Sequence, residues 1–239
     1  MTETLSLRAK IEQSPMGAYQ WMIVVMAAIM NLLDGFDVLA LAFTATAIRG
    51  EFGLTGIELG YLLSAGLFGM TAGSLFLAPL ADKIGRRPLL LMAVSLSAIG
   101  MLGSAFISQY QWLGFWRVIT GLGVGGILVG TNVITSEYSS RKWRSFAISV
   151  YAAGFGIGAV LGGMFAVMLQ GEYGWRSVFL AGAILTGLLL VVLFIWLPES
   201  IDFLTSKQPK NAEVRLNLIA KKIGLAGDWK LPEKMEKVK

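Results

Sequence analysis

Six apolar segments constrain this chain most, because each is long enough to cross a bilayer as a helix. About 20 apolar residues span a hydrocarbon core of about 30 Å. Of the 239 residues, 55% are hydrophobic and only 15% are charged, whereas a soluble domain carries about 25% charged residues. We therefore predict an all-α membrane protein with a six-transmembrane-helix bundle. The expected spans are 20–48, 57–81, 88–107, 111–135, 145–169 and 175–197.

Basic residues are distributed unevenly around these spans. Of the 20 Lys and Arg residues, Arg49 and Arg176 fall on one side and Arg117 lies inside a span, so the remaining 17 fall on the other side. The positive-inside rule then puts both termini in the cytoplasm. We predict a cytoplasmic N-terminus at 1–19, a transmembrane domain at 20–197 and a cytoplasmic segment at 198–239.

Composition also excludes several functions. The net charge of +5 would suggest nucleic acid in a soluble protein, but here the basic residues follow membrane topology, so we predict no nucleic-acid partner. With no cysteine and no histidine, we expect no metal site, and proton traffic must use carboxylates. The sequence shows no nucleotide loop and no nucleophile with its base, so we predict that the chain is not an enzyme.

The segment after Pro198 is basic and polar, with one candidate amphipathic helix at 211–223. We interpret this segment as a linker near anionic lipid headgroups, with a partner-binding helix as the alternative. The helix would place Val214, Leu218 and Ile219 on one side and Arg215, Lys221 and Lys222 elsewhere.

Two acids, Asp34 and Asp37, lie in the middle of the first span. A charge at the bilayer centre costs at least about 2.5 to 3.5 kcal/mol, so such residues indicate a functional site. Residues three apart share a helix face, and Gly35 between them permits a kink or a close backbone approach. We expect both carboxylates to point into one cavity. Two carboxylates in a medium of low dielectric resist ionising together, so we expect one of them to bind and release a proton near physiological pH. The alternative is a structural pair bonded to neighbouring polar groups.

Arg117 lies a few residues inside the fourth span, at a depth similar to that of Asp37. Two interpretations stay open. Arg117 pairs internally with Asp37, or it faces a substrate carboxylate, which an arginine can bind through two parallel hydrogen bonds.

A turn of acidic and basic residues joins the second and third spans at 82–88. Acidic and basic residues at the end of the fourth span lie on the same side of the membrane. Salt bridges of Asp82 and Glu137 with the neighbouring arginines, Arg86, Arg87 and Arg144, could lock this face and break when the bundle rocks. The predicted gate residues are Asp82, Gly85, Arg86, Arg87, Glu137 and Arg144.

Small residues recur every four positions in the second and fifth spans. Such stripes let helix backbones approach closely in lipid. The two spans hold the middle positions of successive three-helix units, as expected of inverted repeats in a transporter half. The predicted helix-packing residues are Gly69, Gly73, Gly154, Gly158 and Gly162.

Four segments together resemble the major facilitator superfamily across essentially the whole chain. Residues 82–88, Asp-Lys-Ile-Gly-Arg-Arg-Pro, resemble its signature loop, and 117–123 resembles its fourth-helix motif. Residues 154–163 resemble the glycine-rich fifth helix, and 197–200, Leu-Pro-Glu-Ser, resembles the exit of the sixth. The resemblance implies the N-terminal half of a twelve-helix major facilitator fold with two three-helix inverted repeats. It also implies a missing C-terminal six-helix half, so we expect a truncated chain, a split gene product or a fragment.

Within that superfamily, Asp34-Gly-Phe-Asp37 is similar to the first-helix motif of aromatic acid:proton symporters, which import benzoate-like and hydroxybenzoate-like anions in bacteria. This implies a symporter in the bacterial inner membrane, driven by a proton gradient and using no cofactor. Its partners would be a small aromatic carboxylate, a proton and the lipid bilayer. The resemblance makes Asp34 and Asp37 necessary for coupled uptake and makes Asp82 part of the cytoplasmic gate.

Other functions stay open at this stage. Sugar porters share the signature loop and a related Pro-Glu-Ser, so a carrier of a sugar or another organic anion is one alternative. A membrane scaffold or sensor that does not transport, with a tail that binds a partner, is another. A half-size transporter working as a homodimer is disfavoured by the asymmetric gate.

Overall fold

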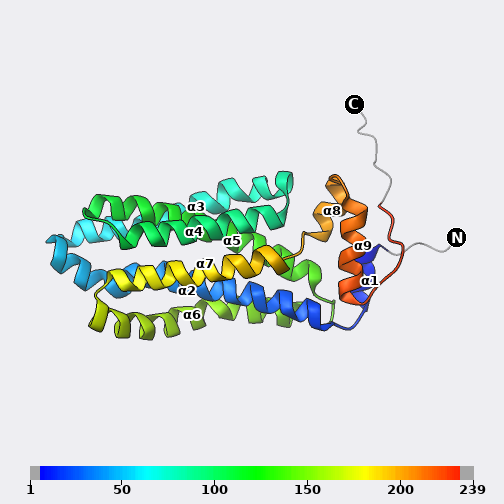
Figure 1. The fold of residues 1–239 in the computed structure, drawn as a ribbon, viewed down its shortest axis with the longest axis horizontal. Helices are drawn as coiled ribbons and strands as arrows, with labels where there is room; N and C mark the ends of the chain where they lie inside the picture. The colour runs from blue at the N-terminus through cyan, green and yellow to red at the C-terminus, as the bar shows by residue number, and fades with distance from the viewer. Residues whose placement is uncertain (1–5, 232–239) are drawn as a thin grey trace, which may run out of the picture.

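The computed structural model describes residues 6–231, and the regular elements in this range are all helices (Figure 1). The ends of the predicted terminal segments, 1–5 and 232–239, lie outside the described residues. The helices are α1 (Leu7–Gln13), α2 (Ala18–Phe52), α3 (Gly56–Ile84), α4 (Arg86–Ala105), α5 (Tyr110–Tyr138), α6 (Arg144–Tyr173), α7 (Arg176–Trp196), α8 (Ile201–Lys207) and α9 (Ala212–Ile223).

Helices α2 to α7 are the six that are long and apolar enough to cross a membrane, which confirms the predicted bundle. Their boundaries follow local signals. Helix α2 ends at Gly53, whose φ of 64° is left-handed. Helix α3 begins with a capping box, in which Thr55 accepts from the Glu58 amide at 3.3 Å and the Glu58 carboxylate accepts from the Thr55 amide at 2.8 Å.

The pairs α3 with α5 and α2 with α6 make the most extensive contacts in the bundle. Glycines on α3 and α6 allow these contacts. A Cβ on Gly158 would collide with the Leu32 carbonyl, and a Cβ on Gly73 would collide with the Leu122 carbonyl. Close backbone approach is how small residues stabilise helix pairs in lipid. The other predicted packing glycines, Gly69, Gly154 and Gly162, also face a neighbouring helix closely.

The pattern of helix contacts reflects two three-helix units, α2 to α4 and α5 to α7. If each helix of one unit is exchanged with its counterpart in the other, the contact of α3 with α5 becomes the contact of α6 with α2. These are the two largest contacts. These two contacts match the predicted internal repeat of a transporter half, whereas the contact of α4 with α5 is more extensive than its counterpart, that of α7 with α2.

Helices α1, α8 and α9 gather beyond one end of the bundle, where α9 runs across the bundle axis (Figure 1). We call them, together with residues 225–231, the terminal cap. Its core includes Leu7, Ile11 and Leu204. Side chain Asn217 holds the backbone of Trp229 with two hydrogen bonds, of 2.9 and 3.1 Å.

The predicted helix at 211–223 is confirmed as α9, but its predicted apolar face was wrong. Val214 and Leu218 are 60% and 57% exposed, whereas Leu216 and Ala220 are buried with Ile219. The prediction used a face containing Val214, but α8 and the start of α2 pack against the neighbouring face.

Candidate functional site

Asp37 lies inside the bundle, where α2 meets α4 and α7. Its side chain is 1% exposed. Ser97 of α4 donates a hydrogen bond of 2.6 Å to Oδ2, and Oδ1 has no partner among the described residues. On α7, a Cβ on Gly182 would lie 3.3 Å from Oδ1, so glycine leaves room for the carboxylate.

Arg117 of α5 also contacts Asp37, through the backbone carbonyl of that residue. Its Nη2 donates to the backbone carbonyl of Asp37 at 2.5 Å, and its Nη1 donates to the sulfur of Met101 at 3.3 Å. The guanidinium lies 5.8 Å from the ring centroid of Phe179. Arg117 therefore contacts Asp37 through the main chain, and the structure records no salt bridge between the two side chains in the described range.

Asp34 lies one turn before Asp37 and is also 1% exposed. Its Oδ2 has no hydrogen-bond partner in the described part of the chain. Nearby on α2, Asn31 donates from Nδ2 to the Tyr151 carbonyl at 2.8 Å, and its Oδ1 is similarly unpartnered. Gly35 permits this packing, because a Cβ there would collide with the Phe155 carbonyl of α6.

A cavity of about 20 Å³ lies beside Arg117, between α2, α3 and α5. It is large enough for about one water molecule. Arg117 and Gly121 line it, but neither aspartate does. The common cavity expected for Asp34 and Asp37 is therefore not seen here; instead, both carboxylates are enclosed by helices.

This buried cluster has the composition of a site that exchanges charge. Two carboxylates and one guanidinium are shielded from solvent, and each retains a polar atom without a partner, namely Asp34 Oδ2, Asp37 Oδ1 and Arg117 Nε. Buried charged groups are stable only when they are paired and hydrogen-bonded. The cluster can thus accept a proton, a water molecule or an anionic ligand group.

At the capped end, Glu199 holds the start of α4. Its Oε1 accepts from the amides of Arg86 at 2.8 Å and Arg87 at 3.0 Å. An anion is favourable at a helix N-terminus. Gly85 precedes this start with a φ of 105°, and a Cβ there would lie 3.1 Å from Glu199 Oε1 and closer still to Oε2. The turn therefore requires glycine for both conformation and space.

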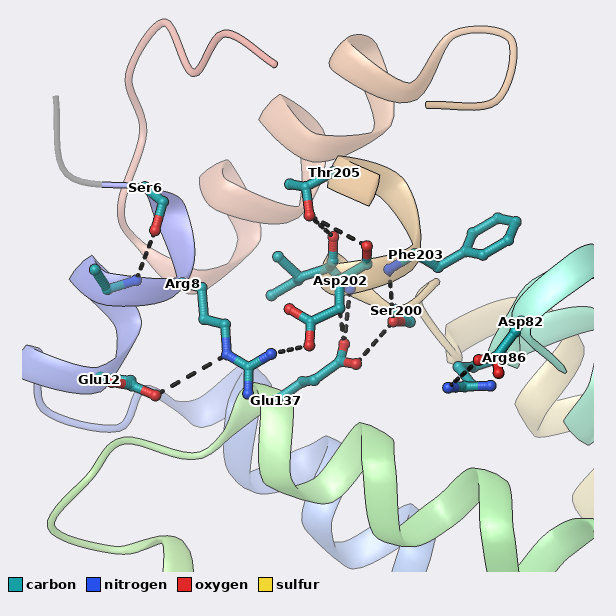
Figure 2. A network of polar contacts seen from close by, with 12 residues as sticks. Ser6, Arg8, Glu12, Asp82, Arg86, Glu137, Ser200, Asp202, Phe203 and Thr205 are labelled. Atoms are coloured by element: carbon teal, nitrogen blue, oxygen red, sulfur yellow. Dashed lines mark hydrogen bonds and ion pairs between the residues drawn. The ribbon is translucent and has the colours of Figure 1, made fainter. Parts of the chain in front are cut away.

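The predicted gate residues form one of the expected salt bridges, between Asp82 and Arg86, but the other contacts differ from those expected (Figure 2). Asp82 and Arg86 form an ion pair of 2.7 Å. Glu137 accepts from the Ser200 hydroxyl and the Ile201 amide, each at 2.8 Å, and so holds the start of α8. No ion pair joins Glu137 to an arginine within the described residues, because its carboxylate faces these donors.

Arg144 and Arg87 likewise have other partners. Arg144 donates to Glu12 of α1 at 2.6 Å. Arg87 donates from Nη2 to the Phe194 carbonyl of α7 at 2.6 Å. The salt bridges expected from these two arginines to Asp82 or Glu137 are thus replaced by contacts with α1 and α7, elements whose positions the sequence did not reveal.

Helix α1 is tied to the network at both ends (Figure 2). Arg8 pairs with Asp202 of α8, and the Glu12 carbonyl accepts from the Arg141 amide at 3.0 Å. The hydrogen bond from Arg144 lowers the pKa of the Glu12 carboxyl below its ordinary value. This helix therefore joins the loop between α5 and α6 to α8.

Two further bonds connect the ends of the spans, the first between the two three-helix units and the second within the unit of α5 to α7. Gln20, near the start of α2, donates to the Tyr138 carbonyl at 2.7 Å. The Tyr138 hydroxyl donates to the Glu199 carbonyl at 2.6 Å. Glu199 itself holds α4, so the ends of α2, α5, α7 and α4 are connected.

Sequence reasoning assigned no role to several residues of these sites. Ser97 was detectable as a hydroxyl in an apolar span, and Glu199 as an acid directly after one. Glu12 and Asp202 gave no such signal, since exposed charges near a membrane are common. The residues without an earlier role are Glu12, Asn31, Ser97, Tyr138, Glu199, Ser200 and Asp202.

The sequence was compared with models of known protein families. The family model described as Major Facilitator Superfamily matches residues 27–229. The chain belongs to the major facilitator superfamily. Its known members in the comparison are transporters, so the prediction that the chain is not an enzyme is confirmed.

Several curated relatives have names that specify aromatic acids. The chain is 34% identical to the 4-hydroxybenzoate transporter of Pseudomonas putida over 234 residues, which cover 97% of this chain and 52% of that protein. It is 36% identical to the gallate transporter of Pseudomonas putida over 204 residues, which cover 85% of this chain and 45% of that protein. The chain thus spans about half the length of the curated relatives it matches.

Solved structures show the same fold. The proton:xylose symporter XylE, bound to 6-bromo-6-deoxy-D-glucose, superposes with a TM-score of 0.75 at 23% identity, covering 86% of this chain and 51% of that chain. The described helices therefore correspond to half of a major facilitator fold, as predicted.

Proposed function

We propose that this chain is the N-terminal half of a proton-coupled importer of aromatic carboxylates such as benzoate or hydroxybenzoate, and that it acts with a second six-helix half. The observation that carries the proposal is the burial of Asp37 and Arg117 against one another, each with an unpartnered polar atom. The names of the relatives at 34% and 36% identity support the substrate class.

The side chains of this cluster suit the coupling of proton binding to substrate binding. A carboxylate enclosed in the bundle is costly when charged and unpaired, so a proton on Asp34 or Asp37 relieves that cost. A guanidinium suits a substrate carboxylate because it can form two parallel hydrogen bonds. In this proposal, Arg117 exchanges its contact with the Asp37 carbonyl for the substrate, and protonation of the aspartates accompanies binding.

The network at the capped end is the proposed cytoplasmic gate. It contains Asp82, Gly85, Arg86, Arg87, Glu137 and Arg144, joined through Glu12 and Glu199. We place the protein in the bacterial inner membrane with both termini cytoplasmic, because the order of the spans along the sequence assigns 17 of the 20 basic residues to the side of the termini. The proton gradient is the proposed driving force, with no cofactor.

Uptake of labelled 4-hydroxybenzoate into proteoliposomes tests the proposal. The chain fused to a matching second half should accumulate substrate under an inward proton gradient, and the chain alone should not. Excess benzoate should compete, and excess glucose should not. Accumulation by the chain alone would contradict the requirement for a second half, and competition by glucose alone would favour a sugar carrier.

Variants of the fusion test the site itself. Asp34→Asn and Asp37→Asn should abolish gradient-driven uptake while the protein stays folded in detergent. Asp228→Asn is the matched control, because Asp228 is exposed in the terminal cap. If both site variants retained full uptake, the coupling role of the aspartates would be refuted.

A further inference from the structure

A groove of about 250 Å³ lies where the end of α7 meets α9 and the start of α2. Three cationic residues, Arg87, Arg215 and Lys222, line it together with Tyr19 and Trp196. Its volume is slightly below the roughly 300 to 1,000 Å³ of pockets for drug-sized ligands, a size that suits one polar headgroup.

The cations of this groove come from α4 and α9, and contacts with the protein hold two of them, Arg87 and Lys222. Arg87, at the start of α4, is fixed by its bond to the Phe194 carbonyl and lies 5.8 Å over the Phe194 ring. The ammonium of Lys222, on α9, lies 5.3 Å from the ring centroid of Tyr19. Arg215 lies two helical turns before Lys222, so both α9 cations reach one side of that helix.

The three cations of the groove have no salt-bridge partner in the described part of the chain. The shielded Nε of Arg87 also has no hydrogen-bond partner within residues 6–231. One carboxylate, that of Glu199, also borders the groove. It accepts from the amides of Arg86, Arg87 and Ser200, so its charge is directed at the start of α4.

An apolar surface continues from the groove along α7. Phe194 and Ile195 are 66% and 65% exposed, and Trp196 is 51% exposed beside them. Helix α7 contains the most apolar stretch of the six spans, which favours contact with lipid chains. A tryptophan at the end of such a span lies typically at the headgroup level of the membrane.

We propose that this groove binds the headgroup of one anionic phospholipid, whose acyl chains lie along the exposed face of α7. The phosphate would contact Arg87, Arg215 and Lys222, and the shape of the site explains why α9 presents Leu218 beside its cations. Basic pockets at the ends of transmembrane helices recognise anionic lipids through this combination of charge and apolar surface. The site lies outside the buried cluster around Asp37.

Equilibrium titration of the detergent-solubilised chain with fluorescent phosphatidylglycerol or fluorescent phosphatidylcholine tests the proposal. Phosphatidylglycerol should bind at least about tenfold more tightly. The double variant Arg215→Gln/Lys222→Gln should weaken phosphatidylglycerol binding about 10- to 30-fold, from two lost contacts with an anionic lipid. Both residues are exposed, so helix content and the melting temperature should stay unchanged.

The double variant Lys210→Gln/Lys221→Gln is the matched control, because it removes the same charge from exposed positions that do not line the groove. It should change affinity less than about threefold. Equal losses in the two double variants would overturn the proposal in favour of diffuse attraction. Displacement of the lipid by soluble glycerol phosphate at equal concentration would also overturn it, because the site would then recognise a free phosphate.

Discussion

Ser97 donates a 2.6 Å hydrogen bond to Oδ2 of Asp37, and it is the one described side chain that donates to this carboxylate. Arg117, the nearby cation, instead binds the main-chain carbonyl of Asp37. The bond from α4 therefore fixes the direction of the carboxylate within the bundle. Ser97 is 0% exposed, so no water can take its place without a rearrangement.

Replacing Ser97 tests this relationship. Ser97→Ala leaves a buried carboxylate without its donor, which should lower the free energy of unfolding by about 1–3 kcal/mol. Ser95→Ala is the control, because Ser95 bonds only to the Leu91 carbonyl of its own helix, and should change stability by under about 0.5 kcal/mol. Denaturant unfolding in detergent measures both. In an Asp37→Asn background the cost of Ser97→Ala should shrink, and an unchanged cost would show that the two side chains are not coupled.

Gly85 should tolerate alanine less well than Gly174. Both have backbone angles that disfavour other residues, with φ of 105° and 77°, so each substitution should cost about 1–3 kcal/mol in strain. At Gly85 the new Cβ also collides with Glu199, whereas space around Gly174 is open. We expect an additional loss of about 1–3 kcal/mol for Gly85→Ala, measured by thermal unfolding. Equal losses would argue against the Glu199 contact.

A pair of glycines on α6 separates packing from helix propensity. Gly158→Ala places a Cβ against the Leu32 carbonyl of α2, and should destabilise the bundle by about 1–3 kcal/mol. Gly156→Ala meets nothing within 4 Å, so it should be neutral or stabilising by about 0.5–1 kcal/mol. The melting temperatures of both variants in detergent check this, and the reverse order would contradict the α2 and α6 contact.

Docking of α1 should weaken in acid. The bond from Arg144 holds the pKa of Glu12 below its usual value of 4.5. A carboxyl with a lowered folded-state pKa stabilises above its unfolded pKa, and this contribution is lost as pH falls through the folded value. The protection factors of the α1 amides, which are corrected for the slower intrinsic exchange in acid, should therefore fall on going from pH 7 to below 4.5.

Glu12→Gln should remove most of that acid dependence, and Glu213→Gln on α9 should not. The stabilisation is small, below about 1 kcal/mol, because the Glu12 side chain is one-third exposed and screened by water. Identical pH profiles for the wild type and Glu12→Gln would refute the role of the pair.

The membrane fold was predictable because the bilayer allows few solutions. A run of apolar residues must form a helix whose backbone bonds are internal, so the spans could be located from hydropathy alone. The cap was not predictable in the same way. Helices α1 and α8 have seven residues each, and such short helices depend on tertiary contacts rather than on propensity.

The residues of the candidate site were predictable from the sequence, but their contacts were not. Asp34, Asp37 and Arg117 were detectable because a charge in an apolar span has a high cost. Their partners were not, since nothing in the sequence shows that Arg117 faces a carbonyl or that Ser97 faces Asp37. For Glu137 and Arg144, the charges suggested ion pairs, but the nearby start of α8 and the acid on α1 bind them instead.

The bonds through Gln20, Tyr138 and Glu199 connect the beginnings and ends of four spans at the capped side of the bundle. This chain of bonds, which runs from α2 through α5 and the segment after α7 to α4, should restrain one three-helix unit from tilting against the other. The six spans should consequently move as one rigid body relative to a partner half, and the capped side should deform least. Alternating access would then arise from movement at the interface between the two halves rather than from a hinge within this chain.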